Sequence, residues 1–354
     1  MSSLSQQTLG EPTPFGSGIA AELHEAPAAV RRQAQELAAP LARLVARLIR
    51  RSPGLAVTCA RGSSAHAATF AKHLIERYVG IPVAPAAPNI ATIYHRKLRL
   101  RNQLFLTISQ SGSSDDLIEA ASAARAAGAV TAAIVNNPES PLASICEFVL
   151  PMAAGSELSV AATKTFVASL AAILRLTAQW AGKEVISSAC DRLPGRLAQA
   201  AEMDWSEALP LLAGATSSVV IGRGPTLAIA REAALKFKET CALHAEAFSS
   251  AEFRHGPIAL VSSAYPILVL APTDESDFGF SDLVADLRRK GASVVVAESG
   301  ANEPGRLPAL PPEQPEADAI CLIQSFYGFL VRLAAQRGID ADRPRHLQKV
   351  TRTR

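Results

Sequence analysis

A hydroxyl-rich segment directly after an apolar run is the part of this chain best suited to chemistry. Residues 104–108 (Leu-Phe-Leu-Thr-Ile) predict a buried strand, and the next residues are Ser109-Gln110-Ser111-Gly112-Ser113-Ser114-Asp115-Asp116. If a helix begins near Ser114, its free N–H groups and its dipole attract negative charge, while the serines and Gln110 add neutral donors. Phosphate is the anion that such a turn suits. Ordinary helix capping explains the same residues equally well.

A second group of reactive side chains lies on one predicted helix. Glu232, Lys236 and Glu239 stand at i, i+4 and i+7, so they share one stripe of a helix whose other positions are mostly apolar. A surface ion-pair ladder, worth about 0.2–0.5 kcal/mol per pair, has the same spacing. The helix begins directly after a glycine turn at Arg223-Gly224, which favours a place at a functional site instead.

Titratable groups continue beyond this helix, with His244 and Glu246 first and then Glu252 and His255. Histidine titrates near neutral pH, and carboxylates beside it can act as acids or bases, as proton transfer requires. A single histidine is more often structural. Gly256-Pro257 breaks the backbone directly after His255, however, as expected for a residue presented on a loop.

The last fifteen residues, 340–354, form a charged tail. Such tails are usually disordered. Pro344 and the few apolar residues near it are also consistent with a segment that folds over a pocket. In that case Lys349 would serve as an amine nucleophile or as a partner for phosphate.

Composition limits the class of protein. The chain has 354 residues, 49% of them hydrophobic, so it can bury a large core, and its length favours two domains. The net charge of +3 is too small and too mixed to imply nucleic acid, and small metabolites fit better. The basic residues 95–101 predict a half-exposed edge strand or rim. Five scattered cysteines without a CxxC motif predict neither disulfides nor structural zinc.

The sequence shows no sign of export or of membrane insertion. Residues 1–18 are polar and lack the basic start and apolar core of a signal peptide, so we expect a cytoplasmic protein. The longest apolar stretch, Phe166 to Trp180, is interrupted by polar residues and is shorter than a spanning helix. We therefore expect no membrane crossing.

Strands and helices alternate along most of the chain. Helices are predicted over residues 19–49, 65–78 and 116–127, and short buried strands over 55–59, 103–108, 130–135 and 148–150. This alternation is typical of a parallel, doubly wound α/β sheet with ligands at the carboxyl ends of the strands.

A second copy of the pattern follows the first. The turn at Arg61-Gly62 matches Arg223-Gly224, and strand 104–108 matches 266–270, both at an offset of 162 residues. The chain is thus predicted to hold a leader and helix (1–45), two α/β domains (46–190 and 191–338) and a tail (339–354). The second copy has carboxylates, Asp274 and Glu275, in place of the serine run, so only the first copy is expected to bind phosphate.

Five motifs together identify a family: Ser109-Gln110-Ser111-Gly112, Ala161-Ala162-Thr163-Lys164, His244-Ala245-Glu246-Ala247, and residues 252–257 and 344–351. Through them the chain resembles the sugar isomerase (SIS) superfamily. Within it, the chain is similar to the isomerase half of glucosamine-6-phosphate synthase and to the stand-alone glucosamine-6-phosphate deaminases. The resemblance implies two flavodoxin-like SIS domains in tandem and a homodimer with shared active sites.

The resemblance also implies roles for individual residues. The phosphate of a sugar would be held by Ser64, Ser109, Gln110, Ser111 and Ser114. Val160 would line the sugar site, and Ala162 stands where synthases place a serine that contacts the sugar.

Four further residues would carry the reaction. The resemblance implies that Glu239 moves a proton between C1 and C2 with Lys236 beside it, and that His255 opens the ring from the neighbouring subunit. Lys349 matches the C-terminal lysine that forms an imine in the synthase. Neither a metal nor another cofactor is expected.

The chain departs from the synthases in several places. Ser2 follows Met1 where synthases carry the glutaminase cysteine, so we expect no ammonia source; Ser113 replaces a glutamate, and Gln348 replaces a small residue. The predicted activity is deamination of glucosamine 6-phosphate to fructose 6-phosphate. An aldose-ketose phosphate isomerase and a sugar-phosphate deglycase are alternatives. A sugar-phosphate sensor without turnover is the alternative from another class, although Glu239, His255 and Lys349 are all present.

Overall fold

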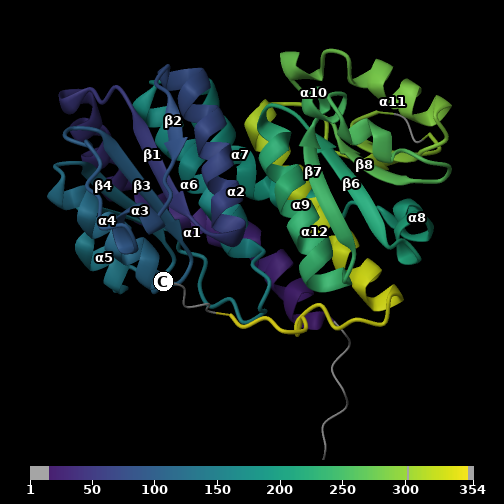
Figure 1. Ribbon diagram of the computed structural model, residues 1–354, viewed down its shortest axis with the longest axis horizontal. Coiled ribbons are helices and arrows are strands. Elements are labelled where there is room, and N and C mark those ends of the chain that lie inside the picture. Colours follow the sequence, from purple (N-terminus) through teal and green to yellow (C-terminus); the bar gives the residue numbers. More distant parts are fainter. Residues whose placement is uncertain (1–15, 301–302, 350–354) are drawn as a thin grey trace, which may run out of the picture.

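The computed structural model describes residues 16–300 and 303–349, which form two α/β units (Figure 1). The strands of the first unit are β1 (Ala56–Ala60), β2 (Val83–Pro85), β3 (Leu104–Ser109), β4 (Val130–Val135) and β5 (Phe148–Pro151). Its helices are α1 (Ser17–Arg51), α2 (Gly62–Leu74), α3 (Asn89–Thr92), α4 (Asp115–Ala126), α5 (Pro141–Ile145) and α6 (Lys164–Trp180), with a π-helical turn, η1 (Ile75–Val79), after α2.

The second unit repeats this plan. Its strands are β6 (Ser217–Gly222), β7 (His244–Ser249), β8 (Pro266–Leu270), β9 (Ser293–Glu298) and β10 (Arg306–Pro308). Its α-helices are α7 (Glu184–Ala201), α8 (Leu209–Ala213), α9 (Pro225–Cys241), α10 (Ser250–Phe253), α11 (Phe280–Arg289) and α12 (Pro315–Gln336). Short 3-10 helices are η2 (Ser206–Ala208), η3 (Pro257–Leu260) and η4 (Glu275–Asp277).

Both sheets are parallel, and both have the same strand order. The first runs β2-β1-β3-β4-β5 and the second β10-β9-β8-β6-β7. When the strands are numbered from one within each unit, both sheets have the order 2-1-3-4-5, the second read from its other edge. It is the flavodoxin-like order, with a switch point between the first and third strands. Strands β3, β4 and β8 are buried at every residue, because helices cover both faces. The predicted fold class and repeat are confirmed.

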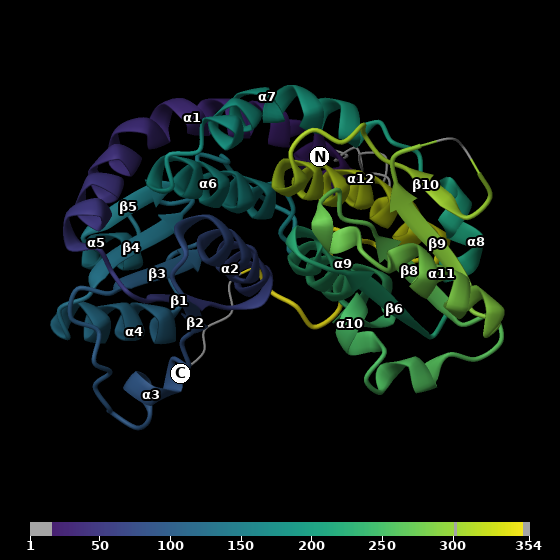
Figure 2. The ribbon, with the colours of Figure 1, turned by 90° about the horizontal axis from the view of Figure 1, so that it is seen from above.

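The two units meet through their inner helices. One hydrophobic core, built from α1, α2, α6, α7, α9 and α12, is continuous between the two sheets, while α4 and α11 lie on the outer faces (Figure 2). Helices α2 and α9, each of which follows the first strand of its unit, pack directly on each other. The carboxyl ends of β1 and β3 therefore open next to α9.

Helix α12 lies in the centre of this core. Phe326 on α12 is fully buried, and its ring lies 5.1 to 6.5 Å from the rings of Trp205, Phe237, Tyr327 and Phe329. By length and composition α12 could cross a membrane. Since 83% of its apolar window is buried inside the protein, we assign it to the core.

Several elements differ from the sequence-based expectation. Residues 95–101 form no edge strand but an irregular, mostly exposed segment before β3. Strands β2, β7 and β10 were not predicted; each is an edge strand, buried on fewer sides and therefore without an apolar run. Helix α1 continues to Arg51. The division into domains at residues 45, 190 and 338 stays a proposal.

We expect the variant Phe326→Ala to lose about 3–5 kcal/mol of stability, because it leaves a cavity among four aromatic rings. Phe278→Ala is the matched control, since that ring is 87% exposed, and it should change stability by no more than about 0.5 kcal/mol. Urea denaturation followed by circular dichroism measures both. Equal midpoints for the two variants would contradict a single core centred on α12.

Candidate active site

The predicted functional residues meet in one cavity at the switch point of the first sheet. It has a volume of about 360 Å³ and lies at the carboxyl ends of β1 and β3, against α9. It is lined by all the predicted substrate-binding residues and by three of the four predicted catalytic residues: Ser64, Ser109, Gln110, Ser111, Ser114, Val160, Ala162, Lys236, Glu239 and Lys349. The two clusters found in the sequence, one in each unit, thus form a single site.

The serine turn after β3 is held by its own backbone. Gly112 has φ +63°, and a Cβ at this position would lie 2.1 Å from Ser140 Oγ, so only glycine fits. Its N–H donates to Ser109 Oγ at 3.1 Å, and the N–H of Ser113 donates to Ser111 Oγ at 3.3 Å. Both hydroxyls accept inside the turn, so their own protons remain available to a ligand.

Other donors on the cavity wall have no protein partner. Helix α4 begins at Asp115, and the side chain of its N-cap residue, Ser114, makes no capping hydrogen bond. In the described part of the chain, the side chains of Ser64 and Gln110 also lack a hydrogen-bond partner. Helix capping therefore does not account for these groups. Their arrangement at the start of a helix suits an anion.

Arg61 adds a positive charge to this wall that the sequence analysis did not assign. Its guanidinium donates to the buried carboxylate of Asp116 at 2.8 to 2.9 Å, while about half of its side chain stays exposed. The pair fixes the guanidinium beside the turn. Arg61 after β1 and Arg223 after β6 occupy matching positions of the repeat, and this match was the signal available from the sequence.

Lys236 is buried at the junction of the two units. Its Nζ lies 2.6 Å from Glu239 Oε2 and 3.3 Å from Glu232 Oε1, and it donates to Ser63 Oγ of α2 at 3.1 Å. Burial alone would lower the pKa of Lys236, but the two carboxylates outweigh it, so the pKa is raised. Lys236 is therefore a fixed cation, and the Glu239 carboxylate beside it borders the cavity.

Three further buried or half-buried polar residues, Glu232, His66 and Tyr327, lie near Lys236, and the sequence analysis did not link them. Glu232 is fully buried and is 2.8 Å from His66 Nδ1 on α2. Burial would raise the pKa of Glu232, but Lys236 and His66 lower it overall. Burial raises the pKa of Tyr327 well above its usual value, and the carboxylates of Glu232 and Glu157 raise it further. Tyr327 is therefore a neutral hydroxyl.

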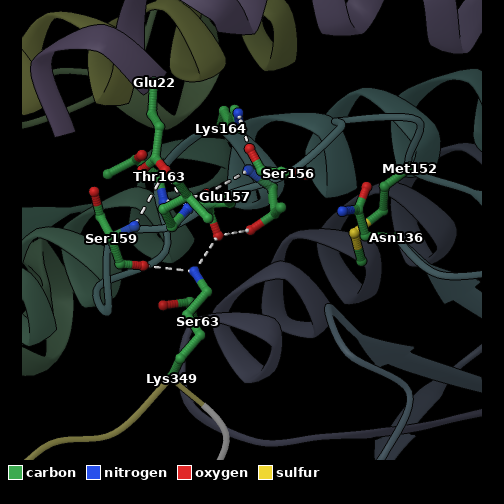
Figure 3. Close-up of polar contacts among 12 residues, drawn as sticks. Glu22, Ser63, Asn136, Met152, Ser156, Glu157, Ser159, Thr163, Lys164 and Lys349 are labelled. Atoms are coloured by element: carbon green, nitrogen blue, oxygen red, sulfur yellow. Dashed lines mark hydrogen bonds and ion pairs between the residues drawn. The ribbon is translucent and has the colours of Figure 1, made fainter. Parts of the chain in front are cut away.

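The C-terminal tail brings Lys349 into the cavity from the second unit. Its Nζ donates to Glu157 Oε2 at 2.8 Å and to the carbonyl oxygen of Ser159 at 2.6 Å (Figure 3). Glu157 is buried and also accepts from the N–H groups of Thr163 and Thr165, both at 3.0 Å. Sequence analysis missed Glu157 because nothing in its spacing links it to a lysine 192 residues away.

The remaining predicted residues lie outside this cavity. His255 is exposed in the turn after α10 and does not line the cavity within one chain. His244 and Glu246 lie on the edge strand β7, and Glu252 lies in the first turn of α10, where its N–H donates to the capping hydroxyl of Ser249 at 3.1 Å. The dense run of titratable residues after α9 is therefore not a single cluster at the site.

The corresponding turn in the second unit has a different role. Asp274, after β8, pairs with Arg77 of η1, and Arg77 also lies 3.0 Å from Glu275 and 3.3 Å from Glu316. A second cavity of about 280 Å³ at this end of the sheet is lined by four carboxylates, from Asp274, Asp277, Glu298 and Asp318. Arg196 lines this cavity too, and the excess of negative charge disfavours phosphate there. That only the first copy binds phosphate stays a prediction.

Comparison with known proteins identifies the family. The model of the SIS domain matches residues 51–178 and 211–304, one stretch in each unit. The glutamine-fructose-6-phosphate aminotransferase (isomerizing) of Corynebacterium glutamicum is 33% identical over 367 residues, covering 95% of this chain and 58% of that protein. The chain belongs to the SIS domain family. It spans about half the length of the curated relatives it matches.

Solved structures agree. A candidate phosphosugar isomerase of Silicibacter pomeroyi DSS-3 has a TM-score of 0.88 at 39% identity and covers 92% of this chain and 99% of its own. The glucosamine-6-phosphate deaminase of Thermotoga maritima shares the fold, with a TM-score of 0.70 at 22% identity, covering 93% of this chain and 100% of its own.

If the serine turn holds phosphate, Ser111→Ala should weaken binding of a hexose 6-phosphate about tenfold, because one donor to a charged group is lost. Ser113→Ala is the control, since its hydroxyl donates to the Ser111 carbonyl oxygen at 3.2 Å and does not line the cavity. Isothermal titration calorimetry measures both without relying on turnover. Equal affinity of the two variants would contradict the assignment.

Proposed function

We propose that this protein is an amino-sugar phosphate deaminase that converts glucosamine 6-phosphate into fructose 6-phosphate and ammonia. One observation carries the proposal: a turn rich in serine donors, a carboxylate paired with a buried lysine, and a second lysine line one cavity of about 360 Å³. This volume falls in the usual range for small-molecule sites.

In this proposal the phosphate binds at the serine turn, and the sugar carbons extend past Val160 and Ala162 toward Glu239. Once the ring is open, the C2 proton is acidic because it is adjacent to the C1 aldehyde. The Glu239 carboxylate removes it, the electron pair moves to the C1 oxygen, and that oxygen takes a proton from solvent to give an enolamine. Glu239 then returns its proton to C1 as the nitrogen lone pair forms the C2=N bond, and loss of a proton from nitrogen to solvent gives a ketimine at C2. Water then adds to C2, and ammonia leaves.

The proposed roles of the two lysines follow from their partners. The ammonium group of Lys236 pairs with the Glu239 carboxylate at 2.6 Å and holds it at the edge of the cavity, where a base is needed. Lys349 is ion-paired with the buried carboxylate of Glu157 at 2.8 Å, so we assign it the role of a charged group and not of a nucleophile. A substrate that brings its own amine has no need of an imine with the protein. We infer that Lys349 stabilises negative charge on the substrate oxygen as C2 is deprotonated.

The same ammonium group also supports a second candidate, an aldose-ketose phosphate isomerase, because it could stabilise an enediolate oxygen. A panel of hexose 6-phosphates with and without a 2-amino group separates the two. Ammonia released in equal amount to fructose 6-phosphate supports the deaminase. Ketose formation from an unaminated sugar, without activity on the 2-amino sugar, supports the isomerase.

The variant Glu239→Gln keeps the size of the side chain and removes the base. We expect kcat to fall about 10²–10⁴-fold, the usual contribution of a positioned acid or base. Binding of glucosamine 6-phosphate by calorimetry should change much less. Exchange of the C2 proton in D₂O, followed by NMR, provides the direct test. Exchange at the native rate would exclude Glu239 as the base.

His255 lies outside the cavity of its own chain, so its proposed role requires a second subunit. We propose that it opens the sugar ring in the site of its partner in a homodimer. Its exposure on a turn before Gly256-Pro257 supports a residue available to another chain.

Two inactive variants, His255→Ala and Glu239→Gln, should then complement each other when their subunits exchange. Random mixing in equal amounts gives hybrid dimers with one intact site, so up to about a quarter of native activity should return. Native mass spectrometry confirms the exchange. No recovery despite exchange would mean that His255 does not act across an interface.

A further inference from the structure

The first turn of α1 takes its cap from the far end of the chain. Gly16, the N-cap residue, has no side chain to offer, and the first turn contains no acidic residue. Helices need acceptors for their first N–H groups. Here the carboxylate of Asp342 supplies two: Oδ2 accepts from the N–H of Gly18 and Oδ1 from that of Ile19, both at 2.8 Å.

The same carboxylate contacts the loop that holds Lys349. Ser159 Oγ donates to Asp342 Oδ1 at 3.4 Å, and the Ser159 carbonyl oxygen accepts from Lys349 Nζ at 2.6 Å. The N–H of Ser159 donates to Glu22 of α1 at 3.1 Å. Ser159 therefore links α1, Asp342 and Lys349, and the next residue, Val160, lines the cavity.

Gly18 packs closely against Ser159 and Asp342. A Cβ on Gly18 would lie 3.0 Å from Ser159 Oγ and 3.1 Å from the Asp342 carboxyl carbon. Ala341 and Pro344, on either side of Asp342, are buried, whereas residues 345–348 are exposed. The tail is thus fixed at Asp342 and meets solvent again just before Lys349. Figure 1 shows it passing the start of α1 on its way to the first unit.

We propose that Asp342 is a positioning residue: by binding the N-terminus of α1 and Ser159, it fixes the tail so that Lys349 reaches the sugar site. We call this contact the tail anchor. Its effect on turnover rests on the proposed function, while its effect on the tail does not. A carboxylate that merely caps α1 would alter stability alone.

Trypsin cleavage after Arg345, followed by mass spectrometry, reports release of the tail without any assay of activity. Asp342 uses both oxygens, so Asp342→Asn must lose one acceptor for an α1 N–H group. We expect cleavage about tenfold faster, as for loss of a helix cap. Asp340→Asn is the matched control: toward the described residues Asp340 accepts through Oδ1 alone, which asparagine retains, so cleavage should stay within twofold.

A second variant keeps the test independent of folding defects. Gly18→Ala adds a methyl group against the Asp342 carboxylate, although alanine by itself favours the helix. The tail anchor predicts faster cleavage after Arg345 in this variant too, without a lower melting temperature. A role confined to helix capping predicts native cleavage.

Kinetics complete the experiment. Asp342→Asn should lower kcat about tenfold with little change in KM, since the serine turn is untouched. When combined with Lys349→Ala, it should cause no further loss, because both changes remove the same contribution. Native cleavage rates in Asp342→Asn would overturn the proposal, and so would faster cleavage with native kcat. If the native protein turns over no sugar phosphate, the proposed function fails, and the cleavage rates still decide the anchor.

Discussion

The buried ammonium group of Lys236 is the interaction on which the site depends. Lys236 is fully buried, and its partners among the described residues are Glu232 and Glu239 on its own helix and Ser63 on α2 of the other unit. Loss of either carboxylate would leave a buried charge without full compensation, which costs several kcal/mol. The ammonium group therefore joins α9 to α2 through Ser63 and holds the Glu239 carboxylate at the edge of the cavity.

The two halves of the molecule share a strand order but have diverged at the ends of their strands. In the first unit, the glycine turn at Gly112 leaves hydroxyls and N–H groups facing the cavity. In the second, the corresponding turn presents Asp274, which binds Arg77 of the first unit. One copy thus supplies the serine turn, and the other supplies the helix that carries Lys236 and Glu239. Neither unit alone contains both.

How much of this arrangement the sequence predicts depends on how far apart along the chain the interacting residues stand. Central strands carry continuous apolar runs, and the stripe of α9 is set by helical spacing, so both were predictable locally. The contacts of Glu157 with Lys349 and of His66 with Glu232 join residues 192 and 166 positions apart. No local pattern encodes them. The sequence of the serine turn suits both helix capping and anion binding, and the structure shows that Ser114 makes no capping bond.

The most direct test of the account is a crystal structure of the protein with an open-chain analogue such as glucitol 6-phosphate. The account predicts phosphate within hydrogen-bond distance of Ser109 and Ser111, and C1 and C2 within about 3.5 Å of the Glu239 carboxylate, as a reacting geometry requires. Phosphate bound in the cavity beside Asp274, or carbons remote from Glu239, would contradict a single site built from both units.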